Sequence, residues 1–209
     1  MRLSVVLSCL IISATAAQNT LAQNAYVKLG QQALMNGDFR TAANHLEKAC
    51  VVDSTNANAL WMLGYSYYHN ENYKKAVTAY SKVIAIKPAD GTAYYYRARA
   101  KAYLGRDITA ANVDKEKNLL GAIVDFTRAI EIEPSDMKYY QNRAIAYREY
   151  GVFKIQQSNK PTDQARGVNA LKASIADLEK VLNTDPSRAD IESLMAVSKE
   201  KLATAQGHH

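Results

Sequence analysis

Residues 57–90 read ANALWMLGYSYYHNENYKKAVTAYSKVIAIKPAD, and this stretch decides the fold. Apolar residues recur three and four positions apart in both halves, which is the spacing of one face of an amphipathic α-helix. Pro88 follows the second half, and proline cannot continue a helix because it lacks a backbone N–H and clashes with the preceding turn. The stretch therefore predicts two consecutive helices that end before Pro88.

The same pattern recurs 34 residues earlier and 34 residues later in the chain, which makes 34 residues the repeat period. Gly30, Gly64 and Ala98 share one small position, and Phe39 and Tyr73 share an aromatic position at the turn between two helices. Small residues at a fixed position allow the two helices of a unit to approach closely. Self-similarity at a fixed period of this length is typical of a stack of repeated supersecondary units.

This pattern resembles the tetratricopeptide repeat, in which each unit is an antiparallel pair of helices. The resemblance implies an all-α, right-handed superhelical solenoid whose last unit is covered by a C-terminal capping helix. We expect four repeats, a capping helix and a tail, with the limits 23–56, 57–90, 91–136, 137–188 and 189–209.

The third and fourth repeats contain inserts, since the intervals from Pro88 to Pro134 and from Pro134 to Pro186 exceed the repeat period. Residues 106–117 are rich in helix formers and can extend either neighbouring helix. Residues 154–167 are polar and contain Pro161, which predicts a solvated loop between helices at 138–150 and 168–183. Insertions at one edge of a stack often mark a functional face, although surface loops also tolerate extra length at little cost.

The composition is that of a folded soluble chain, with 48% hydrophobic and 22% charged residues among 209. Nine glycines and four prolines are too few for an all-β sandwich or barrel. Two cysteines, Cys9 and Cys50, exclude a disulfide framework. The net charge of +6 is spread along the chain without the clustered basic stripe that nucleic-acid binding needs.

No motif positions a catalytic nucleophile, a zinc ion or a phosphate group, because the sequence lacks GxSxG, HExxH and a Walker loop. The four histidines are scattered, and His208 and His209 form a weak metal-binding pair at the end of the chain. We therefore expect a protein that is not an enzyme and that binds no metal and no cofactor.

Residues 1–22 are expected to form a secretory signal peptide rather than part of the fold. Arg2 supplies a positive charge, residues 3–12 are almost entirely apolar, and small residues precede a cleavage site after Ala22. The apolar run is shorter than the ~20 residues needed to cross a bilayer, so no transmembrane segment is expected after signal removal. Cys9 leaves a lipoprotein signal as a rival interpretation. A bacterial periplasm or cell envelope is the expected compartment.

The resemblance also implies a binding surface, because the first helix of each tetratricopeptide repeat lines a concave groove. Among the positions that line it, the candidate binding residues are mainly aromatic and basic, namely Asn58, Trp61, Tyr65, Tyr68, Tyr95, Arg99, Tyr103 and Arg148. Tyr, Trp and Arg are enriched at binding hot spots. The alternative for each aromatic residue is packing between helices.

The expected function is a scaffold or adaptor that binds a peptide segment or partner protein in this groove. Two alternatives remain open: a structural subunit of an envelope complex that associates through its convex face or its inserts, and a receptor for a small ligand or glycan. One subtype of the family grips a terminal carboxylate with Lys and Asn. Val27, Gln31 and Tyr65 occupy those positions here, so that clamp is absent.

Overall fold

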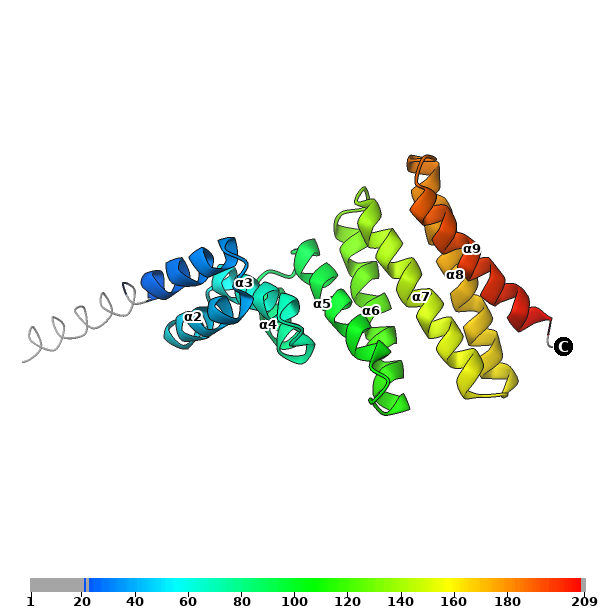
Figure 1. Cartoon of the computed structure of the whole chain (residues 1–209), viewed down its shortest axis with the longest axis horizontal. Coiled ribbons are helices and arrows are strands. Elements are labelled where there is room, and N and C mark those ends of the chain that lie inside the picture. The colour runs from blue at the N-terminus through cyan, green and yellow to red at the C-terminus, as the bar shows by residue number, and fades with distance from the viewer. Residues whose placement is uncertain (1–20, 22, 208–209) are drawn as a thin grey trace, which may run out of the picture. The chain divides into compact units, whose positions relative to one another are not determined.

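The computed structural model describes residue 21 and residues 23–207, and every regular element among them is an α-helix (Figure 1). The all-α class expected from the sequence is confirmed. The helices form two compact units, one ending at Pro88 and the other beginning at Ala89. The expected signal peptide lies outside the described residues, apart from position 21. No helix within the described part of the chain is long and apolar enough to span a bilayer.

The described part of the first unit contains four helices: residues 23–35, α2 (Phe39–Val52), α3 (Ala57–His69) and α4 (Tyr73–Ile86). Each of the last three begins after a capping side chain that accepts a hydrogen bond from a backbone N–H of the first turn. These caps are Asp38, Asn56 and Asn72. The α4 helix ends two residues before Pro88, as the proline predicts.

Close approach of paired helices in the first unit depends on the small positions found in the sequence. A Cβ atom on Gly30 would lie 2.6 Å from the Leu46 side chain, and one on Gly64 would lie 2.9 Å from the Tyr80 ring. Leu46 and Tyr80 are fully buried. Each glycine therefore leaves the space that a large core side chain of the partner helix fills.

The second unit contains five helices: α5 (Gly91–Arg106), α6 (Asn112–Ile132), α7 (Met137–Gln157), α8 (Pro161–Thr184) and α9 (Ala189–Gln206). Neighbouring helices pack in chain order, and α5 and α9 each also contact α7. One hydrophobic core runs through all five helices and includes Phe126, Tyr139, Ala144, Leu178 and Ile191. The α9 helix covers α8, as expected for a capping helix.

The prediction of a solvated loop over residues 154–167 is wrong. The α7 helix continues to Gln157 and α8 begins at Pro161, so that only residues 158–160 link them. Pro161 occupies the first turn of α8, where the missing N–H is harmless and the fixed φ angle suits a helix. Half of the other insert, residues 112–117, extends α6, which begins at Asn112, and residues 107–111 link it to α5.

Where the inserts lengthen the helices, a buried lysine of α7 pairs with carboxylates of α6 and α8, and two glycines allow α7 and α8 to pack closely. The Lys154 ammonium lies 3.1 Å from a Glu116 carboxylate oxygen of α6 and 2.9 Å from one of Asp163 in α8. A Cβ on either Gly151 or Gly167 would lie 2.8 Å from the backbone oxygen of the other glycine. Only glycine at this crossing allows α7 and α8 to come so close.

A buried ion pair recurs in both helix pairs of the second unit. Arg97 of α5 donates two hydrogen bonds to Asp125 of α6 at 2.7 and 2.8 Å, and Arg143 of α7 donates two to Asp177 of α8 at 2.8 Å. Two parallel bonds of this kind fix both the distance and the orientation of the paired groups. The ion pairs therefore set the register within each helix pair.

Candidate functional site

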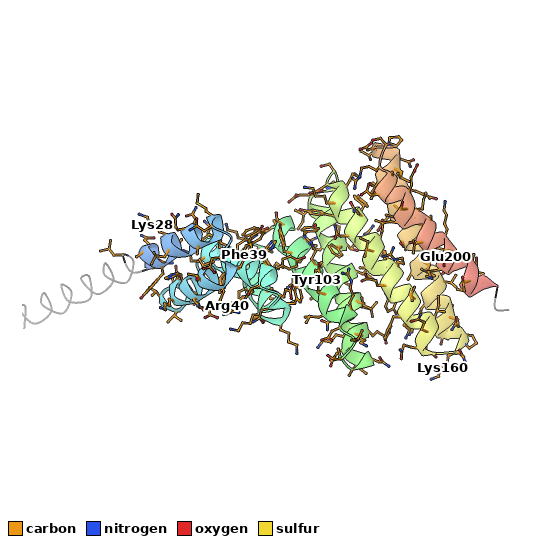
Figure 2. All side chains as sticks on the ribbon, in the orientation of Figure 1. Lys28, Phe39, Arg40, Tyr103, Lys160 and Glu200 are labelled. Atoms are coloured by element: carbon orange, nitrogen blue, oxygen red, sulfur yellow. The ribbon has the colours of Figure 1, made fainter. Side chains whose placement is uncertain are left out.

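An aromatic ladder runs along one face of α3. Trp61, Tyr65 and His69 are four residues apart, so their side chains lie one above another on the helix surface. The ring centroids of Trp61 and Tyr65 are 5.5 Å apart, and those of Tyr65 and His69 are 4.2 Å apart. Phe39, at the start of α2 (Figure 2), stacks on His69 at 4.7 Å. These four side chains are the aromatic ladder.

The Trp61 end of the ladder packs against the core, and the His69 end is exposed. Trp61 also packs edge-on against the ring of Tyr80, which is fully buried, with 6.2 Å between ring centroids. Trp61 and Tyr65 remain half-buried, and His69 is exposed. Aromatic side chains held in this way offer a large contact area and lose little conformational freedom on binding.

Of the two other α3 residues expected to bind a partner, Tyr68 is buried and Asn58 is exposed. Tyr68 is only 5% exposed and packs against Tyr73 with 5.7 Å between ring centroids, so it belongs to the core rather than to an open groove. Asn58 is exposed in the first turn of α3, where its side-chain oxygen accepts a hydrogen bond from the Lys87 ammonium at 3.5 Å.

A second candidate surface is a cleft of about 190 Å³ between α5 and α7 in the second unit. We call it the arginine cleft, and it is lined by Arg99, Ala102, Tyr103, Arg106, Phe126, Asn142 and Ile145. Two of its lining residues, Arg99 and Tyr103 (the latter labelled in Figure 2), are among the predicted binding residues.

Aromatic rings orient the two arginines of this cleft. The Arg99 guanidinium lies 5.6 Å from the ring centroid of Tyr95 and 6.0 Å from that of Tyr96. The Arg106 guanidinium lies 5.1 Å from that of Tyr103. Such cation–π contacts hold the planar guanidinium groups against the aromatic rings.

Tyr95 supports the arginine cleft from below rather than lining it. Its side chain is 9% exposed and packs against Tyr139 with 5.0 Å between ring centroids, which corrects the expectation of an open aromatic floor at this position. Burial raises the pKa of the Tyr95 phenol. Its oxygen therefore stays protonated, and it accepts a hydrogen bond from Asn142 at 3.3 Å.

Arg148 does not line the arginine cleft. It lines a neighbouring pocket of about 430 Å³ together with Arg106 and Glu149. The Arg106 guanidinium lies 2.7 Å from one Glu149 carboxylate oxygen. Burial raises the pKa of the Glu149 carboxyl, and the Arg106 charge opposes this shift.

No three His, Cys, Asp or Glu side chains come close enough to hold a metal ion within residues 21 and 23–207. The groups gathered at both surfaces are aromatic rings, guanidinium groups and amides. These groups bind apolar side chains and acidic groups through contact area, charge and hydrogen bonds.

Comparison with known proteins identifies the repeat. Residues 27–91 match the family model of the tetratricopeptide repeat. This part of the chain carries tetratricopeptide repeats. Over 187 residues the chain is 27% identical to DnaJ homolog subfamily C member 7 of Mus musculus, a match that covers 82% of this chain. The match covers only 36% of that longer relative, about a third of its length.

Solved structures share the fold. MamA from Desulfovibrio magneticus RS-1 aligns with a TM-score of 0.65 and 18% identity, over 90% of both chains. The second TPR domain of the human RPAP3 protein, in complex with the HSP70 peptide SGPTIEEVD, aligns with a TM-score of 0.53 and 16% identity. That match covers 61% of this chain and 97% of the domain.

The groove-lining repeat positions include Trp61, Tyr65 and His69 of the ladder and Arg99 and Tyr103 of the arginine cleft. Other residues of these two surfaces come from outside those positions. Phe39 joins the ladder from the start of α2, and Asn142 joins the cleft from α7. The sequence pattern places Arg106 within an insert, although it ends α5. A three-residue spacing from Tyr103, which places Arg106 on the same helix face, is the sequence signal that could have found it.

Proposed function

We propose that the protein is an exported, non-catalytic scaffold that binds a peptide segment or partner protein through the first helices of its repeats. The observation that carries the proposal is that the aromatic ladder and the arginine cleft use corresponding repeat positions. Trp61 and Tyr65 lie one repeat period before Tyr95 and Arg99, and His69 lies one period before Tyr103. The peptide complex of the RPAP3 domain supports a role of this kind for the fold.

We further propose that the protein works in a bacterial periplasm or cell envelope. The order of charge, apolar run and small residues in positions 1–22 supports this compartment. Fusion of residues 1–22 to a reporter that is active only after export tests the proposal. An inactive reporter would contradict it.

The binding function is tested by crosslinking pull-down from the envelope fraction with the wild type and three variants. The variant Trp61→Ala/Tyr65→Ala removes the centre of the ladder, and Arg99→Ala removes one of the two arginine side chains of the cleft. Tyr26→Ala changes a half-buried tyrosine outside both surfaces and is the matched control. We expect a partner that the wild type and the control recover and that the folded ladder or cleft variants lose. Equal recovery by all forms would contradict the proposal.

The exposed side of α6 favours the alternative of a structural subunit in an envelope complex. Val113, Leu120 and Val124 are 79%, 40% and 65% exposed and fall on one face of the helix. A protein that associates through this face loses its partner in the variant Leu120→Ser/Val124→Ser and keeps it when the ladder is removed. The same pull-down therefore separates the two functions.

A further inference from the structure

The C-terminal end of α7 has a pocket on each side. The pocket of about 430 Å³ lies against the ends of α5 and α6, and a second pocket of about 220 Å³ lies between α7 and α9. Val152 and Gln156 line both pockets. The two pockets therefore form one continuous surface that crosses α7, which we call the insert surface.

The inserts of the third and fourth repeats contribute to this surface. Lys115 belongs to the insert at 106–117, and Ile155 and Gln156 belong to the insert at 154–167. A repeat without inserts has none of these positions. The insert surface is therefore distinct from the aromatic ladder, and it adjoins the arginine cleft, with which it shares Arg106.

The floor of the insert surface is apolar and its charged groups are mostly basic. Leu119, Val152 and Phe153 line the larger pocket, and Ile155 and Ala205 line the smaller one. The basic residues are Arg106, Lys115, Arg148 and Lys201, and the one acidic residue in the two linings is Glu149. Arg106 is paired with Glu149 and Lys201 with Glu200, so Lys115 and Arg148 carry the net positive charge that favours an acidic ligand.

Glu149 also offers a hydrogen-bond acceptor inside the larger pocket. Its Oε2 atom is buried and has no hydrogen-bond partner among the described residues. A buried acceptor of this kind is costly unless a donor reaches it. The backbone N–H of a bound polypeptide would supply that donor, whereas a purely acidic small ion would not.

We propose that the insert surface binds an extended segment of a partner protein in which acidic and apolar side chains alternate. An extended segment presents acidic and apolar side chains next to one another along its length, and each pocket places basic and apolar groups side by side. A helix is about 10 Å across, which about three or four extended residues span at about 3.3 Å each. The proposal goes beyond the function assigned to the ladder and the cleft and does not rest on it.

Fluorescence anisotropy with three labelled octapeptides tests the chemistry of this surface. Each peptide is acetylated and amidated; one alternates Asp with Leu, one alternates Lys with Leu, and one alternates Asp with Ser. We expect saturable binding of the Asp–Leu peptide that weakens with added salt, and at least about tenfold weaker binding of the other two. No binding of the Asp–Leu peptide up to about 1 mM, or equal binding of the Lys–Leu peptide, would overturn the proposal.

Variants place the binding on the insert surface. Arg148→Gln removes one charge from the larger pocket and is expected to weaken the Asp–Leu peptide at least about fivefold. Val152→Trp fills the wall shared by both pockets without changing any charge, and is expected to abolish binding. Arg166→Gln, an exposed arginine of α8, is the matched control and is expected to leave binding unchanged. Circular dichroism identifies any variant that fails to fold.

The double variant Trp61→Ala/Tyr65→Ala separates this inference from the proposed function. We expect it to bind the Asp–Leu peptide as tightly as the wild type, whether or not it loses a partner in the pull-down. Loss of peptide binding in this variant, with Arg148→Gln and Val152→Trp unaffected, would move the binding to the ladder and overturn the proposal.

Discussion

Single glycines decide how closely the helices of this protein pack. The sequence predicts that Gly64 is small to allow two helices to meet, and the structure identifies the group it accommodates. A Cβ at this position would lie 2.9–3.0 Å from three carbon atoms of the Tyr80 ring. The ring is fully buried, so it has no free space into which it can move.

Gly64→Ala is therefore expected to destabilise the protein by about 1–3 kcal/mol, the usual cost of overpacking a core. Gly121→Ala is the matched control, because its Cβ would lie 3.2–3.6 Å from the outer atoms of the Lys101 side chain, which can shift by a few tenths of an ångström while its ammonium stays paired with Asp125. That substitution is expected to be neutral or to stabilise α6 by up to about 1 kcal/mol through helix propensity. Urea denaturation of both variants measures the difference, and equal stability of the two would refute the packing argument.

Glu149 is expected to make stability depend on pH. Burial raises the pKa of its carboxyl above the ordinary value of 4.5, so the folded chain binds this proton more tightly than the unfolded chain does. The contribution of this group to stability is fully present below the unfolded pKa and is lost as the pH rises through the folded pKa.

Glu149→Gln removes this titration. The free energy of unfolding of the variant, relative to the wild type, is expected to rise as the pH increases from about 4 to about 7. Chemical denaturation at several pH values measures this relative free energy of unfolding. Glu179→Gln, on the exposed side of α8, is the control for replacing a carboxylate with an amide. A relative stability that falls with increasing pH would contradict the assignment.

At the scale of helix pairs, the same two facing repeat positions hold an ion pair in some repeats and an apolar pair in another. Arg97 with Asp125 and Arg143 with Asp177 form ion pairs in the third and fourth repeats. The corresponding positions of the second repeat carry Leu63 and Ala79, and both are buried. An apolar pair therefore fills the same place without a charge.

This comparison predicts a strong coupling between Arg143 and Asp177. Asp177→Ala alone leaves the arginine without its carboxylate and is expected to cost about 2–4 kcal/mol, less than a fully buried pair because Arg143 is 16% exposed. The double variant Arg143→Leu/Asp177→Ala reproduces the second repeat and is expected to lie within about 1 kcal/mol of the wild type. A double-mutant cycle by chemical denaturation measures both values. A double variant as unstable as the single one would contradict the prediction.

Helix existence was predictable from the sequence, whereas the conformation of the second insert was not. Period and proline positions placed the ends of α4, α6 and α8 because these signals are local. The polar segment at 154–167 gave a misleading local signal, since its helical state depends on contacts of Lys154 with two other helices. A residue such as Pro161 fits the first turn of a helix as well as it fits a loop.

At the scale of the whole molecule, repeat positions predicted which helix faces carry aromatic and basic residues, but not how deeply each side chain is buried. Trp61, Tyr65 and Arg99 lie on candidate surfaces, whereas Tyr68 and Tyr95 lie in the cores of their units. Position in a repeat fixes only the direction of a side chain. Burial depends on the size of the neighbouring residues, such as Tyr139 against Tyr95, and one repeat pattern does not specify these sizes.

The second unit is expected to fold without the first, because its hydrophobic core includes only residues from Tyr95 onward. A fragment of residues 89–207 should keep its helical circular dichroism and melt cooperatively. A fragment of residues 89–188 lacks α9 and therefore loses Ile191, which is fully buried, so that the core beneath it is exposed. The fragment also loses the hydrogen bond of 3.0 Å between Ser174 and Ser198. We expect the shorter fragment to be at least about 3 kcal/mol less stable, from the lost burial of Ile191 and its neighbours in α9. Equal stability of the two fragments would show that α9 does not act as a cap, and an unfolded longer fragment would show that the second unit depends on the first.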